Sequence, residues 1–108
     1  MSRIKIILYC NFKPNKALVA FKINGHGPDY VCAGISVLAI NIINCIEKFT
    51  GDKFIYEYSK NGGMIDFRFL NQRKISHDAA LLIKTLEVGL KDIAKSYKNF
   101  VELKEVSI

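Results

Sequence analysis

Residues 25–36 read Gly25-His26-Gly27-Pro28-Asp29-Tyr30-Val31-Cys32-Ala33-Gly34-Ile35-Ser36, and the predicted fold is organised around them. The first half of this stretch is rich in glycine and contains Pro28, which cannot continue the hydrogen-bond ladder of a strand. The second half begins a long apolar run that is typical of a buried helix. The stretch therefore predicts a strand that ends in a short loop, followed directly by the first turn of a helix.

Two side chains of this stretch, His26 and Cys32, have the chemistry of a nucleophilic pair. The N–H groups and the dipole at the start of a helix stabilise a thiolate, and a protonated imidazole beside the sulfur stabilises it further. Because His26 lies between two glycines, its loop can fold back over the helix start. We therefore predict a Cys–His catalytic site, in which backbone N–H groups of the first helical turn bind the oxyanion.

Neighbouring residues have predicted supporting roles. Asp29 is a candidate helix N-cap, whose carboxylate would accept the N–H groups of Val31 and Cys32, orient His26, or do both. Ser36 lies one helical turn after Cys32 on the same face. Its hydroxyl would contact the substrate or the oxyanion, or would bond to the Cys32 carbonyl. The loop that shapes the site comprises Gly25, Gly27 and Pro28.

The other two cysteines have a simpler interpretation. A cysteine in an apolar helix is often a small core residue, which we expect for Cys45, and the same interpretation stays open for Cys32. Cys10 ends a predicted strand and is expected to be inert. Since the three cysteines fit neither a disulfide framework nor a zinc-ligand spacing, we expect a reduced, cytoplasmic compartment, no metal and no cofactor.

Alternation of apolar and polar side chains predicts the strands, and apolar residues at helical spacing predict the helices. The predicted strands cover residues 3–10, 17–23, 53–59, 64–70 and 100–106, and the predicted helices cover residues 30–49 and 77–97. Lys60-Asn61-Gly62-Gly63 is typical of a tight hairpin turn, and Ser76 of a helix N-cap. This order predicts an α+β two-layer sandwich, with a mostly antiparallel sheet of four or five strands and both helices on one face.

The chain has 108 residues, half of them hydrophobic, so residues 1–108 are predicted to form a single domain. The helix over residues 30–49 is apolar on nearly all sides, and a domain this small cannot cover it completely. We therefore expect a homodimer. The apolar run from Val31 to Ile46 is shorter than the roughly 20 residues of a membrane span, and residues 1–10 are predicted to form a strand instead of a signal peptide. No membrane association is expected.

The chain carries 16 Lys and Arg against 10 Asp and Glu, a net charge of +6. Such an excess favours acidic partners, above all nucleic acid or the ribosome, although the same charges could simply solvate the surface. A second hypothesis is therefore a non-catalytic RNA- or ribosome-binding module, with aromatic side chains such as Tyr56 and Tyr58 on a free sheet face. A third is a purely structural dimeric subunit, which would leave the arrangement of His26 and Cys32 unexplained.

At residues 25–36 the sequence resembles the ribosomal-processing cysteine proteases, the Prp family. The signature of this family is Gly-His, a short variable loop, and then Asp-x-Val-Cys-Ala-x-[Val/Ile]-Ser at a helix start. Here it stands as Gly25-His26 followed by residues 29–36, and the resemblance extends over the whole chain in element order. The chain departs from the family pattern at Gly27 and Gly34, where alanine is common, and its loop before Asp29 is short.

The resemblance implies a small cytosolic bacterial protease that removes the N-terminal extension of a large-subunit ribosomal protein during ribosome maturation. It implies that His26 and Cys32 are the catalytic dyad, that Asp29 and Ser36 support it, and that the protein is a homodimer whose loop closes over the substrate. Ribosomal proteins are themselves basic, so the positive charge of the chain would favour a substrate already bound to ribosomal RNA. We therefore expect a transient contact with the ribosome.

Overall fold

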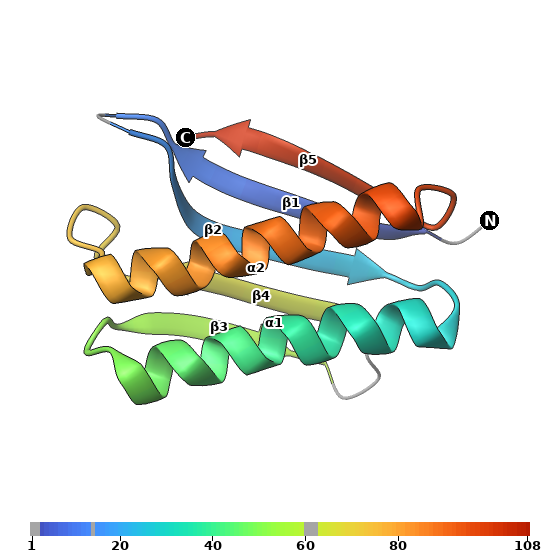
Figure 1. Cartoon of the computed structure of the whole chain (residues 1–108), viewed down its shortest axis with the longest axis horizontal. Helices are drawn as coiled ribbons and strands as arrows, with labels where there is room; N and C mark the ends of the chain where they lie inside the picture. The colour runs from blue at the N-terminus through green and yellow to red at the C-terminus, as the bar shows by residue number, and fades with distance from the viewer. Residues whose placement is uncertain (1–2, 14, 60–62) are drawn as a thin grey trace.

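The structure, a computed structural model, describes residues 3–13, 15–59 and 63–108. In these ranges the chain forms a mixed five-stranded sheet with two helices packed on one face (Figure 1). The elements in chain order are β1 (Ile4–Asn11), β2 (Ala17–Gly25), α1 (Asp29–Phe49), β3 (Phe54–Tyr58), β4 (Met64–Phe69), α2 (His77–Ser96) and β5 (Val101–Ser107). The predicted α+β order is confirmed.

The strands lie in the sheet in the order β3-β4-β2-β1-β5. β1 and β2 form an antiparallel hairpin, β2 pairs antiparallel with β4, and β4 pairs antiparallel with β3. β5 is the exception, because α2 carries the chain across the sheet and returns it parallel to β1 (Figure 1). The predicted Asn61-Gly62 turn lies outside the described residues, but the two strands that flank it pair as a hairpin requires.

The core lies between the sheet and the two helices. Ile6 and Leu8 are buried and alternate along β1 with more exposed residues, as a strand with one covered face requires. The ring of Phe67 is stacked on Phe21 at 5.3 Å between centroids and meets Phe69 edge-on at 5.0 Å. Burial of each such ring contributes roughly 1.5–3 kcal/mol to stability. The buried side chains of α1 in this core are Val31, Ile35, Ala39, Ile42, Ile43 and Ile46.

The start of α1 differs from the prediction at one residue. Pro28 occupies the N-cap position, and its carbonyl accepts the N–H groups of Val31 and Cys32, each at 3.0 Å. Asp29 is the first helical residue, and no described side chain caps the helix. The prediction that Asp29 is the N-cap is therefore wrong, because the preceding carbonyl already accepts the two N–H groups that its carboxylate would bind.

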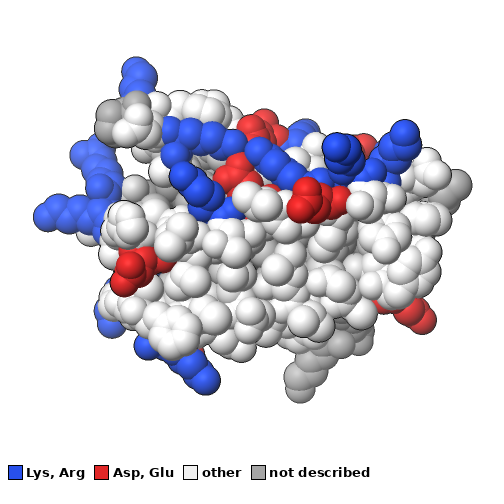
Figure 2. Space-filling model, in the orientation of Figure 1, with Lys and Arg blue, Asp and Glu red and all other residues white. Residues whose placement is uncertain are grey.

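The outer surface of α1 is apolar and exposed. Its Val37 side chain is 69% exposed. Figure 2 shows that charged residues gather over α2, whereas the middle of α1 carries none. By length and composition alone, α1 is the one described helix that could cross a membrane. The core helix of a water-soluble domain meets the same criteria, and the inner side of α1 packs into the core. The absence of a membrane span stays a prediction.

Tyr56 and Tyr58 do not lie on the free face of the sheet. In the register of β3 and β4, Tyr56 pairs with Phe67 and Tyr58 pairs with Ile65, and both of these partners are buried in the core. Paired residues of neighbouring strands point to the same side of a sheet, so both tyrosines lie on the helix-covered side, at the β3 edge. The predicted aromatic platform on the free face is wrong, because strand register, which the local sequence did not show, decides the face.

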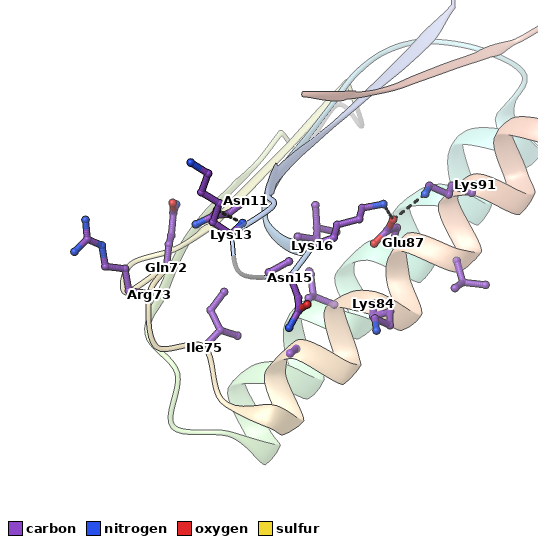
Figure 3. Close-up of a pocket in the computed structure, with 15 residues that line it drawn as sticks. Asn11, Lys13, Asn15, Lys16, Gln72, Arg73, Ile75, Lys84, Glu87 and Lys91 are labelled. Atoms are coloured by element: carbon purple, nitrogen blue, oxygen red, sulfur yellow. Dashed lines mark hydrogen bonds and ion pairs between the residues drawn. The ribbon is translucent and has the colours of Figure 1, made fainter. Parts of the chain in front are cut away.

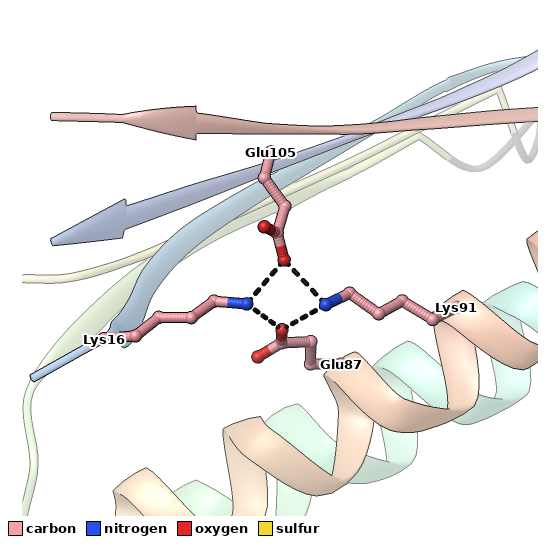
Figure 4. Close-up of polar contacts among 4 residues, drawn as sticks. All are labelled: Lys16, Glu87, Lys91 and Glu105. Carbon is pink, nitrogen blue, oxygen red and sulfur yellow. Dashed lines mark hydrogen bonds and ion pairs between the residues drawn. The ribbon is translucent and has the colours of Figure 1, made fainter. Parts of the chain in front are cut away.

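Four charged side chains tie β5 to the rest of the fold in a closed square (Figure 4). Lys16 and Lys91 each contact both Glu87 and Glu105, at distances between nitrogen and oxygen of 2.6 to 2.8 Å. Lys16 precedes β2, Glu87 and Lys91 belong to α2, and Glu105 belongs to β5. The hydrogen bonds from Lys16 and Lys91 lower the pKa of Glu105 to about 2, and bonds to the two carboxylates raise the pKa of both lysines.

We predict that Glu105→Gln lowers the free energy of unfolding at pH 7 by about 1 kcal/mol, because both lysines would then share a single carboxylate. The pKa of Glu105 is lower in the folded protein than the usual 4.5. Its contribution is therefore complete above about pH 4.5 and is lost as the pH falls through about 2. Urea denaturation of both proteins across this range measures the difference.

Glu102→Gln is the matched control, because Glu102 is also on β5 but makes one exposed contact, at 3.2 Å to Arg3. Such pairs contribute little, so this variant should stay close to the parent at every pH. Equal losses for Glu102→Gln and Glu105→Gln, or a Glu105 effect that persists unchanged at pH 2, would contradict the stabilising role of the square.

Candidate active site

Gly25 ends β2 and determines where the loop of the site begins. Its φ of +103° lies in the left-handed region that favours glycine, and a Cβ atom there would collide with the Arg3 carbonyl oxygen. Its N–H donates to the Gly63 carbonyl at 3.1 Å. Gly25 therefore joins the end of β2 to the backbone of β1 and to the residue before β4, and residues 26–28 leave the sheet from a defined point.

Cys32 lies in the first turn of α1, where the sequence predicted it. Its side chain is half-buried, and its thiol donates to the carbonyl of Gly27 at 3.6 Å. Its backbone N–H is bound to the Pro28 carbonyl, so it is not free to bind an oxyanion in this conformation. The first two N–H groups of the helix, those of Asp29 and Tyr30, have no partner within a helix. The Gly27 carbonyl thus holds the sulfur, and the Pro28 carbonyl the backbone N–H of Cys32, at the helix start.

His26 is exposed in the loop between β2 and α1, and its ring lies against Gly63. A Cβ atom on Gly63 would lie 3.2 Å from Cε1 and 3.3 Å from Nε2 of the imidazole. Among the described residues no hydrogen bond joins His26 to Cys32, whose thiol bonds to Gly27 instead. The structure therefore brings imidazole and thiol to the same end of α1, in an arrangement where the direct contact is not made.

Ser36 and Cys32 line one small cavity between the first two turns of α1 and the sheet. Its volume is about 10 Å³, and the other lining residues are Ile4, Ile23, Ile35, Met64 and Ile65. No hydrogen bond from the Ser36 hydroxyl to the Cys32 carbonyl is present in the described part of the chain, although Thr50 at the end of α1 and Thr85 on α2 make such bonds. Ser36 therefore faces the same apolar hollow as the sulfur.

The remaining predicted residues surround this centre. Asp29 is exposed in the first turn, where a carboxylate favours the helix but adds negative charge near the sulfur. Gly27 packs close to Ile4, since a Cβ on it would lie 3.1 Å from the Ile4 Cδ1. No three His, Cys, Asp or Glu side chains gather as a metal site in the described ranges. The expectation of no metal and no cofactor stays a prediction.

Gly63 is a site residue that the sequence analysis missed. The sequence indicates it only as part of a hairpin turn, yet its carbonyl accepts the Gly25 N–H and its lack of a side chain leaves the space that the His26 ring occupies. The one signal in the sequence is that Gly63 is a second glycine after Asn61, and a two-residue Asn-Gly turn does not require a second glycine. What it contacts depends on the β2–β4 pairing, which brings residues far apart in sequence together.

The other two thiols differ from Cys32. Cys10 is fully buried at the end of β1, and burial raises the pKa of its thiol. Cys45 is half-buried and lies about one turn before the end of α1, away from the helix start. All three cysteines are free. Cys32 is therefore the thiol that combines access with the favourable electrostatics of a helix N-terminus.

A thiol held at a helix start beneath a histidine-bearing loop is the arrangement of a cysteine-dependent hydrolase. The comparison with known families agrees: the family model of the cysteine protease Prp matches residues 3–102. The chain belongs to this family and is a cysteine protease. Membership favours an enzyme over both the non-catalytic RNA-binding module and the purely structural subunit.

Relatives of known name support the assignment. The chain is 27% identical over 93 residues to the ribosomal processing cysteine protease Prp of Bacillus subtilis, covering 79% of this chain and 83% of that one. It is 30% identical over 78 residues to the protein of the same name from Staphylococcus aureus, covering 72% of each. The likeness therefore spans most of both relatives.

Solved structures show the same fold. The S. aureus ribosomal processing protease Prp, in complex with a covalently linked product peptide, superposes with a TM-score of 0.84 at 25% identity, covering 95% of this chain and 99% of that one. A Streptococcus mutans protein superposes with a TM-score of 0.83 at 20% identity, covering 98% and 99%, and shows the fold alone. The two-layer α+β architecture is thus that of the family.

We predict that iodoacetamide modifies Cys32 faster than Cys10 and Cys45 at pH 7, because Cys32 is partly exposed at a helix start beside a histidine-bearing loop. Cys10 should stay unmodified in the folded protein, because it is fully buried. In His26→Ala the modification of Cys32 should be slower. Peptide mapping by mass spectrometry after timed labelling measures each cysteine separately.

Gly63→Ala should change the rate of Cys32 labelling, since the added Cβ would press on the imidazole. Gly51→Ala is its matched control, because no atom lies within 4 Å of a Cβ placed on Gly51. Equal modification of Cys10, Cys32 and Cys45 at every pH would contradict a Cys32–His26 pair.

Proposed function

We propose that this cysteine protease is an endopeptidase that removes the N-terminal extension of a large-subunit ribosomal protein during ribosome maturation. The observation that carries the proposal is the Cys32 thiol in the first turn of α1 with His26 in the loop before it. The substrate is supported by relatives named as ribosomal processing proteases, one of which has been solved in complex with a substrate peptide.

The reaction is an acyl transfer in two steps. His26 takes the proton of Cys32, and the thiolate attacks the scissile carbonyl to form a tetrahedral intermediate. The carbon–nitrogen bond breaks, His26 protonates the leaving amine, and a thioester to Cys32 remains. His26 then takes a proton from water, whose oxygen attacks the thioester. The carbon–sulfur bond breaks, the acyl group leaves as a carboxylic acid, and the Cys32 sulfur takes the proton back from His26. The N–H groups of Asp29 and Tyr30 are the donors nearest the helix start for the oxyanion.

The reaction needs a change in the loop of residues 26–28. The thiol now donates to the Gly27 carbonyl, and the imidazole lies on Gly63. A shift of this loop releases the thiol and turns His26 toward it, and catalytic hydrogen bonds often tighten only when the substrate binds. Gly27 permits such a shift because it lacks a side chain. Ser36 lines the small cavity beside Cys32, and the proposed role of its hydroxyl is to contact the substrate.

The exposed side of α1 supports a homodimer. Val37 is 69% exposed and Tyr30 is 64% exposed, and the middle of this surface carries no charge (Figure 2). Apolar surfaces of this kind mark contacts between proteins. A second copy that packs against α1 would cover them.

The proposed compartment is the cytoplasm, where nascent ribosomes supply the substrate and where a transient ribosome contact brings enzyme and substrate together. Three free cysteines support a reducing compartment.

Cys32→Ser should abolish cleavage of a ribosomal protein that carries its N-terminal extension, and His26→Ala should lower kcat/KM by roughly 100-fold or more. Intact-mass spectrometry of the substrate measures the cleavage. Cys45→Ser is the matched control, because it makes the same chemical change on the same helix and should retain full activity. A Cys32→Ser protein that cleaves as fast as the parent would overturn the proposal.

Val37→Asp should convert the dimer to a monomer, because the carboxylate would be buried without a partner at the α1 surface. In the monomer the residue is exposed, so the fold should persist. Light scattering after size-exclusion chromatography measures the mass. Ile55→Asp, which changes an exposed apolar residue of β3, should leave the dimer intact. A parent protein that is monomeric at micromolar concentration would contradict this prediction.

A further inference from the structure

A basic groove lies at the far end of the sheet from Cys32. It has a volume of about 760 Å³ and lies between the end of the β1–β2 hairpin, the loop before α2, and α2 itself (Figure 3). The hairpin contributes Lys13 and Lys16, the loop contributes Arg73, and α2 contributes Lys84 and Lys91. Cations from three separate elements therefore line one concave surface.

Three of these cations are not neutralised by the protein. Glu87 is the acidic residue among the lining residues, and its carboxylate is held by Lys16 and Lys91 in the ion-pair square. In the described part of the chain no carboxylate lies within 4.0 Å of the charged groups of Lys13, Arg73 or Lys84, all of which are exposed. Figure 3 shows Lys13 and Arg73 near each other on one side of the groove, extending away from α2, and Lys84 on α2 at the opposite side. Their charge is available to a ligand.

The lining suits an extended polyanion better than a single small anion. The three free cations stand on different elements, so one phosphate ion would meet them singly, whereas a chain of phosphates could meet them in turn. Asn15 and Gln72 add amide groups for sugar hydroxyls, and Ile75 and Val88 add apolar surface for ribose or base faces. This mixture is the chemistry of a sugar–phosphate backbone.

We propose that the basic groove binds RNA through its phosphodiester backbone. RNA is favoured over an anionic membrane because the cations line a concavity, which a flat bilayer surface does not enter. The overall charge of +6 strengthens attraction to any polyanion. RNA binding itself does not depend on the proposed function. Its use, to place the protease on a ribosomal particle that carries the basic substrate, rests on that function.

The position of the groove lets RNA and substrate bind together. β2 begins at Ala17, which lines the groove, and ends at Gly25, which begins the loop of the catalytic site. A strand rises about 3.3 Å per residue, so the two sites lie roughly 25–30 Å apart. RNA in the groove would therefore leave the helix start of α1 open, and groove variants should cleave a free peptide normally.

The test is fluorescence anisotropy with a labelled 20-nucleotide single-stranded RNA at several salt concentrations. The variant Lys13→Gln/Arg73→Gln/Lys84→Gln should lose at least about tenfold in affinity at low salt. Its slope of log affinity against log salt should become shallower by about 2, as expected for three lost phosphate contacts. Lys5→Gln/Arg68→Gln/Lys104→Gln is the matched control, because it removes the same charge from the free face of the sheet. It should retain the parental affinity.

Every outcome decides the proposal. Loss of RNA affinity in the groove variant alone supports it, and equal losses in both variants, absence of RNA binding by the parent, or groove-dependent binding to phosphatidylserine vesicles without RNA binding would overturn it. The single variant Arg73→Glu, in an exposed loop, repeats the test should the triple variant not fold. Cleavage of a free extension peptide is assayed in parallel. RNA binding by a parent protein that does not cleave the peptide would support the RNA-binding proposal and contradict the proposed function.

Discussion

The backbone conformation at Gly25 is the constraint on which the site depends. The residue ends β2 at a positive φ, lies against the Arg3 carbonyl with no room for a side chain, and donates its N–H to Gly63. This one residue therefore joins the ends of β1, β2 and β4 and sends the chain out of the sheet toward α1. His26 and Cys32 occupy their places because the three-residue loop between β2 and α1 starts from that point. A substitution at Gly25 would move the whole loop relative to the helix.

The opposite end of the sheet is held by charge instead of by backbone conformation. Lys16, Glu87, Lys91 and Glu105 close a square that joins the hairpin, α2 and β5. Each carboxylate meets two ammonium groups, so the square is neutral and its members are unavailable to ligands. The cations beside it, Lys13, Arg73 and Lys84, are left with an unbalanced charge. Charges that stabilise the fold therefore lie beside charges that a ligand can reach, and β2 runs from this end of the sheet to the end that carries Cys32.

Much of the fold could be predicted because its causes are local. Alternation along β1 and β2 marked the covered face, Ser76 marked the start of α2, and its hydroxyl does accept the Ala79 N–H. Errors arose where a distant or competing group decided the outcome. The Pro28 carbonyl, and not Asp29, accepts the first N–H groups of α1. Pairing with Phe67 determines which face of the sheet Tyr56 lies on. The ring of His26 packs against Gly63, a contact that local sequence does not indicate.

By itself the sequence determined the identity of the chemistry: a histidine and a cysteine joined by a short loop, at the start of an apolar helix, within a chain of the Prp family. Helix and strand periodicity and turn residues are properties of neighbouring positions, so a sequence carries them directly. Only the tertiary structure decided that the imidazole rests on Gly63, that the thiol bonds to Gly27, and that five cations surround one groove. These contacts join residues far apart in the chain or depend on how a loop closes, and packing of the sheet against two helices determines them.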